Sequence, residues 1–172
     1  MDAITQSGHV IIRPTQKQDC LQIRALIQVP FFPSDLQELA NYQQMPDGPK
    51  IDAKVLEKHG FDTDSPFFES TVAENTETKK IVGYTIFYYL YDCLEGKYLY
   101  LEDICVTEDY RKKGVGAGLF ESVVKAGVAK DCSSMRWDVL KWNPARKFYD
   151  KYGATNLTES QGVLFHRVYN VQ

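Results

Sequence analysis

The sequence predicts a mixed α/β fold, with one sheet flanked by helices. Residues 81–91 and 97–106 are long strand-like runs joined by the short polar turn 92–96, so they should be antiparallel neighbours. Residues 116–130 carry apolar side chains at helical spacing, which is typical of an amphipathic helix that packs on a sheet. Aromatic residues make up 13% of the chain, and this share favours a sheet over a pure helix bundle.

The composition is that of a soluble globular protein. A chain of 172 residues is predicted to form one domain, residues 1–172. The net charge of −3 argues against a nucleic-acid binder and allows a cationic substrate. No apolar run is long enough to span a membrane and the start of the chain shows no signal-peptide pattern, so we expect a cytoplasmic protein without a membrane partner.

The four cysteines are far apart, and neither a Cys-x-x-Cys motif nor a histidine cluster accompanies them. We therefore expect no metal site and no disulfide framework, but reduced, half-buried core cysteines. The positions are Cys20, Cys93, Cys105 and Cys132.

The first third of the chain is predicted to be helical after one short strand at 10–12. Helices are expected at 17–28, from Ser34 to about Gln44, and over residues 51–60, with Gly60 as the closing glycine. The irregular region 28–66 is where a lid over the substrate is expected. Its Phe31-Phe32 pair should pack under that lid or against a partner subunit.

The remaining elements are strands at 68–73, 134–140 and 163–169, together with a short helix at 144–152. Asn143 is predicted as the N-cap of that helix and Pro144 as its first residue, with Gly153 after its end. The resulting order lacks the regular alternation of strand and helix in a Rossmann domain.

A glycine-containing turn, Arg111-Lys112-Lys113-Gly114-Val115-Gly116-Ala117-Gly118, lies between a strand and a helix start. Glycine lets successive backbone N–H groups converge, and a helix N-terminus adds donors and partial positive charge. The residues 111–117 can therefore donate N–H groups to a pyrophosphate, with three cationic side chains close by. A Walker motif or a kinase glycine loop is excluded, because neither Gly-Lys-Ser/Thr nor Gly-x-Gly-x-x-Gly is present.

This turn and its flanks resemble the acetyl-CoA site of the GCN5-related N-acetyltransferases (GNAT). The resemblance rests on Tyr98-Leu99-Tyr100-Leu101-Glu102-Asp103, on Tyr110-Arg111-x-x-Gly114-x-Gly116-x-Gly118, on Trp142-Asn143 and on Phe148-Tyr149-x-x-x-Gly153-Ala154. The chain is most similar to the diamine (spermidine/spermine) and thialysine acetyltransferases of this superfamily. The resemblance implies the GNAT fold, a mixed and mostly antiparallel sheet with splayed strands at the acetyl-CoA site. It also implies a homodimer with acetyl-CoA as cosubstrate.

Roles for individual residues follow from the resemblance. The pantetheine arm of the cosubstrate should pair with the bulged strand before the turn, while the turn holds the pyrophosphate. Cys105 is then expected to be a packing residue and not a nucleophile, because the sequence shows no group that would activate its thiol. The residues expected to contact the cosubstrate are Ile104, Cys105, Val106, Arg111, Lys112, Lys113, Gly114, Val115, Gly116, Ala117, Asn143 and Ala145.

Acetyl transfer to an amine requires a base for the ammonium and an acid for the departing thiolate. By resemblance Tyr149 is the expected acid and Glu102, acting through water, the expected base. Glu102 and Asp103 are adjacent in a strand, so in regular geometry only one of them can face the cleft. The alternative reading is that one acid is exposed and the other bonded to a neighbouring loop.

The acceptor amine is left open between a polyamine or diamine and an amino acid with a side-chain amine. Arg136 favours the latter if it binds a carboxylate, although a solvated charge at a strand edge explains it equally well. Two further readings are a protein N-terminal or lysine acetyltransferase and a non-catalytic CoA-binding module. The residues expected to contact the substrate are Tyr42, Gln43, Asp92, Glu102, Asp103, Arg136, Asp138 and Gln161.

Overall fold

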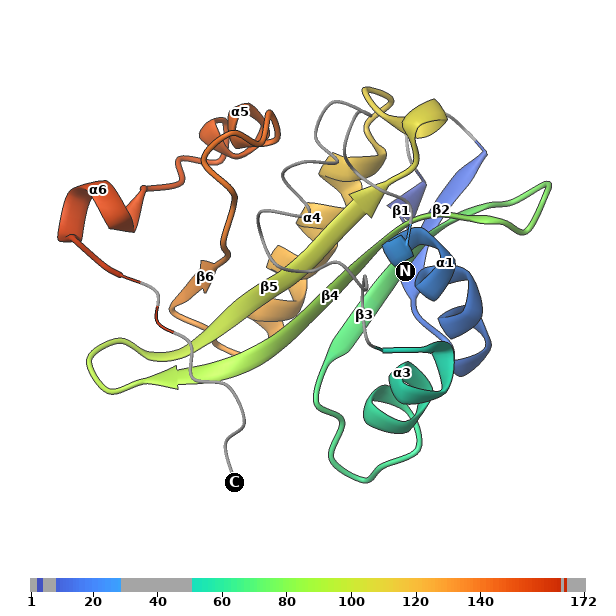
Figure 1. Ribbon diagram of the computed structural model, residues 1–172, viewed down its shortest axis with the longest axis horizontal. Coiled ribbons are helices and arrows are strands. Elements are labelled where there is room, and N and C mark those ends of the chain that lie inside the picture. Colours follow the sequence, from blue (N-terminus) through green and yellow to red (C-terminus); the bar gives the residue numbers. More distant parts are fainter. Residues whose placement is uncertain (1–2, 5–8, 29–50, 165, 167–172) are drawn as a thin grey trace. The chain divides into compact units, whose positions relative to one another are not determined.

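The computed structural model describes residues 3–4, 9–28, 51–164 and 166. The chain forms two compact units, Met1–Trp137 and Asp138–Gln172, and each is described by itself. The first unit contains β1 (Ala3–Ile4), β2 (Val10–Pro14), η1 (Lys17–Asp19), α1 (Cys20–Gln28), α3 (Ala53–Gly60), β3 (Glu69–Asn75), β4 (Ile81–Asp92), β5 (Gly96–Val106), η3 (Glu108–Tyr110), α4 (Val115–Ala129) and β6 (Ser134–Arg136) (Figure 1). The second unit contains α5 (Arg146–Asp150) and α6 (Leu157–Gln161).

One six-stranded sheet organises the first unit, with the strands in the order β1-β2-β3-β4-β5-β6. Strands β1 to β5 pair antiparallel with their neighbours, whereas β6 pairs parallel with β5. Because β4 and β5 are joined by a tight turn, they pair along most of their length, from Gly83↔Val106 to Asp92↔Gly96. The predicted mixed α/β class and the antiparallel hairpin are both confirmed.

Helices cover both faces of the sheet (Figure 1). On one face, Cys20 and Ile23 of α1 and Leu56 of α3 form a hydrophobic cluster with Val72 and Tyr84 of the sheet. On the other face, α4 packs against the sheet through a second cluster, which contains Val10, Ile12, Ala73, Val82, Val115 and Leu119. The amphipathic helix expected at 116–130 is therefore confirmed, with a shift of one residue at each end.

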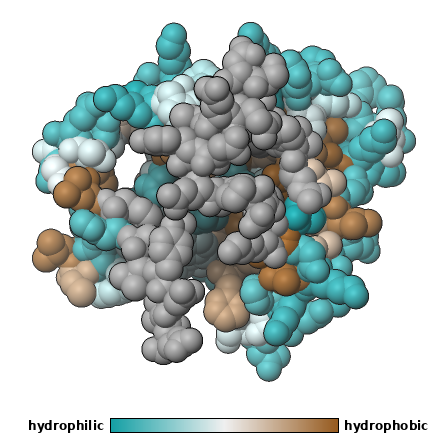
Figure 2. Space-filling model, viewed as in Figure 1, coloured by the Kyte–Doolittle hydropathy of each residue, from teal (hydrophilic) through white to brown (hydrophobic). Residues whose placement is uncertain are grey.

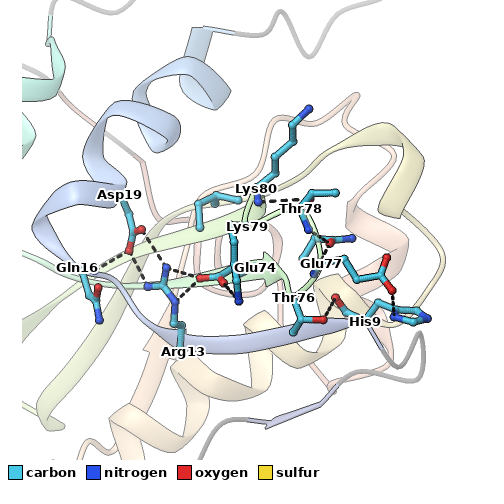
Figure 3. A network of polar contacts seen from close by, with 12 residues as sticks. His9, Arg13, Gln16, Asp19, Glu74, Thr76, Glu77, Thr78, Lys79 and Lys80 are labelled. Carbon is cyan, nitrogen blue, oxygen red and sulfur yellow. Dashed lines mark hydrogen bonds and ion pairs between the residues drawn. The ribbon is translucent and has the colours of Figure 1, made fainter.

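A partly buried ionic network ties the start of the chain to the sheet (Figure 3). Arg13 on β2 contacts Asp19 of η1 at 2.7 Å and Glu74 of β3 at 2.7 Å. The exposed side chain of Lys79 approaches the other oxygen of Glu74 at 3.4 Å. Burial alone raises the pKa of the Asp19 carboxyl, but hydrogen bonds from Arg13 and from the Gln16 N–H outweigh it, so the pKa lies below its ordinary value.

Apolar groups also reach solvent, and in Figure 2 they interrupt a mainly hydrophilic surface. The largest exposed apolar side chains of the sheet unit include Leu21, Phe67, Tyr91 and Leu94. The four cysteines form no disulfide: Cys20 and Cys105 are buried, but Cys93 in the β4–β5 turn is exposed, contrary to its expected place in the core. Among the described residues, no helix has the length and apolarity needed to cross a membrane.

Several predicted boundaries in the sheet unit were wrong. The strand expected at 134–140 ends at Arg136, because β6 pairs with β5 only at residues 98–100. The helix expected at 17–28 begins as the 3₁₀ turn η1, in which Asp19 accepts a hydrogen bond from the Gln16 N–H. The helix expected between Ser34 and Gln44 lies outside the described residues, as does the Phe31-Phe32 pair.

The second unit differs more from the prediction. The helix expected at 144–152 spans only Arg146–Asp150. The N–H groups of its first residues, Arg146, Lys147 and Phe148, bond to the carbonyls of residues 143–145, three residues back, so the segment before α5 forms successive turns. The strand expected at 163–169 is wrong at residues 163, 164 and 166, while the rest of that range is not described. A short helix, α6, lies just before it instead, N-capped by Asn156 and ended by Gly162 at a φ of 67°.

Candidate functional site

A β-bulge at Glu102 interrupts the pairing of β5 with β4. Ile86 pairs with Asp103 and Phe87 with Leu101, so Glu102 is the extra residue of β5. Before the bulge, Leu99 contacts α4 next to Gly127, whereas after it Ile104 and Val106 pack into the cluster on α4. The bulge therefore shifts the alternation of β5 by one residue.

As a consequence, Glu102 and Asp103 lie on the same face of the sheet, opposite to α4. Tyr88 donates a hydrogen bond to Oε2 of Glu102 at 2.9 Å, and Tyr84 donates one to Oδ2 of Asp103. Tyr84 and Tyr88 point to one face because they are four positions apart on β4 and successive side chains of a strand alternate between faces. The expectation that only one of the two acids can face this side was wrong, because it assumed regular strand geometry.

The two carboxyl groups differ in their surroundings. Glu102 is exposed, whereas Asp103 is half-buried beside the fully buried Tyr84. Burial raises the pKa of Asp103, and the hydrogen bonds from Tyr84 and from the Ile104 N–H act against that shift. Burial and the neighbouring carboxyl also raise the pKa of Tyr84, so its hydroxyl stays protonated as the donor to Asp103. The pair thus combines a solvent-accessible acid with a fixed, less accessible one.

β6 pairs with β5 only as far as Tyr100, so beyond this residue the same edge of β5 is not paired with β6. Ile104, Cys105 and Val106 pair with β4 on the other side. These are the residues expected to pair with an extended arm of a ligand, and their place in the sheet suits that role. Burial raises the pKa of the Cys105 thiol to about 12, which favours packing over nucleophilic attack.

The glycine-containing turn connects this strand to α4. Gly114 adopts a φ of 83° and precedes the first helical residue, while Lys112 adopts a φ of 59°. The first N–H groups of α4, a helix of 15 residues, have no partner within the helix. Arg111 donates from Nε to the Val106 carbonyl at 3.0 Å, and Lys113 lies 5.6 Å from the Tyr110 ring. An anion could accept hydrogen bonds from these N–H groups.

Two further predicted residues lie together at the far end of the hairpin. Arg136 on β6 donates to Asp92 at 2.9 Å and to Glu95 at 3.0 Å. Two backbone N–H groups, from Leu94 and Glu95, also bond to Asp92. These backbone bonds and Arg136 hold the pKa of Asp92 below its ordinary range. Both residues are thus engaged in a defined ionic cluster.

The second unit carries the other predicted residues. Asn143 accepts a hydrogen bond from the Ala145 N–H at 2.8 Å, in the turn that leads into α5. Tyr149 lies within α5, and its ring is 5.2 Å from that of Phe148. Asp138 is exposed in the segment before α5, and Gln161 is the last residue of α6. Tyr42 and Gln43 lie outside the described residues.

Sequence reasoning missed the tyrosines that hold the two acids, Tyr84 and Tyr88, and the turn residue Glu95. The tight turn 92–96 gives a register in which Tyr88 pairs with Tyr100, two positions from Glu102. Tyr88 could therefore have been predicted from the sequence as a neighbour of Glu102. The contact of Tyr84 with Asp103 depends on the bulge. The family resemblance implied a bulge in this strand, which is confirmed, but no local signal in the sequence placed it at Glu102.

Comparison with known proteins assigns the chain to a family. The model of the acetyltransferase (GNAT) family matches residues 23–154, which include the bulged strand, the glycine turn and α5. The chain belongs to the GNAT acetyltransferase family. It is therefore an acetyl-CoA-dependent N-acetyltransferase, as the resemblance of its motifs predicted.

The acetyltransferase is similar to small-amine enzymes. It is 35% identical to a thialysine N-epsilon-acetyltransferase of Bos taurus over 160 residues, which cover 89% of this chain and 88% of the relative. It is 32% identical to a human spermidine/spermine N(1)-acetyltransferase-like protein 1 over 92% of this chain and 22% of that protein.

Solved structures confirm the GNAT fold. An aminoglycoside N-acetyltransferase AAC(6')-Iy in complex with CoA superposes with a TM-score of 0.64. The match covers 94% of this chain and 96% of the other, at 21% identity. At this identity the likeness concerns the fold alone.

Proposed function

We propose that this acetyltransferase transfers the acetyl group of acetyl-CoA to a primary amine of a small diamine or polyamine, or of an amino acid with a side-chain amine. The transfer occurs by direct attack of the amine within a ternary complex. The observation that carries this proposal is the bulge at Glu102, which gives one face of the sheet two adjacent carboxyl groups. Two acids beside tyrosine side chains suit a cationic acceptor.

The described residues fit acetyl-CoA. Ile104, Cys105 and Val106 would hold the pantetheine arm through backbone groups on the edge of β5 that is not paired with β6. The residues 111–117 would hold the pyrophosphate with the N–H groups that α4 leaves without helical partners, and Gly114 allows the turn at a φ of 83°. Asn143 and Ala145 are proposed as further contacts. When bound, acetyl-CoA supplies the acetyl group as a thioester.

Glu102 is proposed to take the proton from the acceptor ammonium through water. An aliphatic ammonium has a pKa of ~10.4, so holding the amine neutral at pH 7 costs on the order of 4–5 kcal/mol. Glu102 is exposed to solvent, and the Tyr88 hydroxyl bonds to one of its oxygens, which leaves the other to accept. The half-buried Asp103 would add negative charge beside the amine.

Tyr149 is proposed to donate the proton that the departing thiolate needs. Replacement of Tyr149 by Phe should lower kcat at least about tenfold, because general acid catalysis contributes about 10²–10⁴. Acetyl-CoA affinity should stay nearly intact, because the ring is retained. Thiol release under saturating substrates measures kcat, and isothermal titration measures the affinity. The matched control is Tyr152→Phe, three residues on, which should leave kcat unchanged. A kcat for Tyr149→Phe equal to wild type would remove this tyrosine from the mechanism.

A panel of acceptors tests the proposed function. Purified protein is mixed with acetyl-CoA and putrescine, spermidine, thialysine, lysine, ornithine or a histone-tail peptide, and thiol release is followed. Release with at least one small amine is the expected result. Release with the peptide alone would show the alternative, a protein acetyltransferase. Tight acetyl-CoA binding without release for any acceptor would indicate a non-catalytic CoA-binding module instead.

We also propose that the chain acts as a single catalytic domain and as a homodimer, as its resemblance to the diamine enzymes implies. The family match supports the first point, because residues 23–154 cross the boundary between the two compact units. Sedimentation at micromolar concentration should give twice the mass of the chain, and a monomer mass would contradict the dimer.

A further inference from the structure

The turn that is proposed to hold the pyrophosphate combines an uncommon backbone with an exposed position. Lys112 adopts a φ of 59° and Gly114 a φ of 83°, so both are left-handed. This conformation is unfavourable for a lysine and persists where the surrounding structure enforces it. The residues 111–114 are exposed, so burial of their own side chains does not enforce it. The shape of the turn is therefore set from its two ends.

Both ends of the turn are anchored. After the turn, Val115 is fully buried in the cluster between α4 and the sheet. Before the turn, Tyr110 packs against the same cluster, and its ring centroid lies 5.6 Å from Nζ of Lys113. The Tyr110 hydroxyl accepts a hydrogen bond of 2.8 Å from Nδ2 of Asn75. The residue directly before Arg111 is thus tied to the sheet by a side-chain hydrogen bond.

Asn75 is itself fixed by its surroundings. It is the last residue of β3, and it is 7% exposed. Its Oδ1 accepts hydrogen bonds from the N–H groups of Glu77 at 3.0 Å and Thr78 at 2.8 Å, in the turn between β3 and β4. These two bonds orient the amide so that its nitrogen donates to Tyr110. An asparagine suits this position because an ionised aspartate cannot donate and a leucine of similar size can do neither.

We infer that Asn75 is a positioning residue for acetyl-CoA, because it holds residues 111–114, through Tyr110, in the conformation that meets the pyrophosphate. This inference rests on the proposed function, in which that turn holds the pyrophosphate. It also separates two parts of the cosubstrate. Binding of the pyrophosphate should depend on the bond between Asn75 and Tyr110. Binding of the pantetheine arm along residues 104–106 should not, because these residues are held by pairing with β4.

Two acetyl donors that differ in the pyrophosphate test the inference. S-acetylpantetheine has the thioester and the pantetheine arm of acetyl-CoA but neither its pyrophosphate nor its nucleotide. Tyr110→Phe removes the hydroxyl and retains the ring beside Lys113. The variant should raise KM for acetyl-CoA about three- to tenfold, leave kcat within about twofold, and change KM for S-acetylpantetheine less than about twofold. Titration calorimetry with CoA, in the absence of any acceptor amine, should show the same loss of affinity.

A double-mutant cycle assigns the effect to the hydrogen bond itself. In an Asn75→Ala background, Tyr110→Phe should change the affinity for CoA by less than about twofold, because the bond is already absent. Thr76→Val is the matched control, since the Thr76 hydroxyl donates to the His9 carbonyl at 3.2 Å and not to Tyr110. Its removal should leave KM for both donors unchanged.

The possible results separate this inference from the proposed function. Equal losses for the two donors in Tyr110→Phe would overturn the inference and indicate a general role of the bond in the sheet. An unchanged affinity for CoA would also overturn it. If the wild type binds pantetheine as tightly as CoA, the proposed role of the turn fails, and the inference fails with it. A selective loss for CoA in a protein that acetylates no amine would support the inference and contradict the proposed function.

Discussion

Replacement of Glu102 by Gln is expected to lower kcat/KM for the acceptor amine by about 10²–10⁴ at pH 7, because the variant cannot take the ammonium proton. The amide keeps the size of the side chain and can still accept a hydrogen bond from Tyr88. Steady-state thiol release at several amine concentrations measures the loss. Raising the pH should restore part of the activity, since the fraction of neutral amine grows about tenfold for each pH unit below its pKa.

The matched control for this prediction is Tyr88→Phe, which keeps the carboxylate and removes its hydroxyl donor. We expect a loss of less than about tenfold, as for one hydrogen bond to a charged group. Acetyl-CoA affinity should remain at the wild-type value in both variants. If Glu102→Gln retains wild-type kcat/KM, then Glu102 is not the base, and Asp103→Asn becomes the variant to measure.

Replacement of Arg13 by Met is expected to lower the free energy of unfolding by about 3–5 kcal/mol. Methionine retains most of the apolar stem, so the change leaves Asp19 and Glu74 without their shared cation. The side chains of these two acids are only 5% and 12% exposed, which makes an unpaired charge there costly. Urea unfolding followed by circular dichroism measures the loss, which is a large part of the stability of a typical domain.

Lys79→Met is the matched control, because Lys79 contacts the same Glu74 from an exposed position. Its effect should stay below about 1 kcal/mol. An equal loss of unfolding free energy in both variants would show that burial does not increase the contribution of the Arg13 ion pairs to stability.

The stability of the wild type should also depend on pH through Asp19. The pKa of Asp19 in the folded chain lies below 3.8, so this contribution is present above pH 3.8 and disappears as the pH falls through the lowered pKa. In Arg13→Met, burial without the cation should raise that pKa above its ordinary value. The stability difference between the two proteins should therefore shrink on acidification, and a constant difference from pH 7 to pH 3 would contradict the assignment.

Local signals were sufficient for most of the fold. The alternation and length of β4 and β5, the polar turn between them and the amphipathic pattern of α4 each depend on neighbours in the sequence. The glycine turn could also be predicted from the sequence, because glycine adopts a left-handed φ, as Gly114 does, without steric cost. Where local signals compete, as in the successive turns around Asn143 and Pro144, the start of α5 was misplaced.

The sequence by itself determined the family, the acetyl donor and the strand that carries Glu102 and Asp103. The tertiary structure decided how these acids lie, because a bulge depends on the register between two strands and not on the residues of one. A shift of one residue reverses the face of every later side chain, and here it brings both acids to one side. The partners of Asp92 and Arg136 were decided in the same way, since β6 joins β5 only after α4 has crossed the sheet.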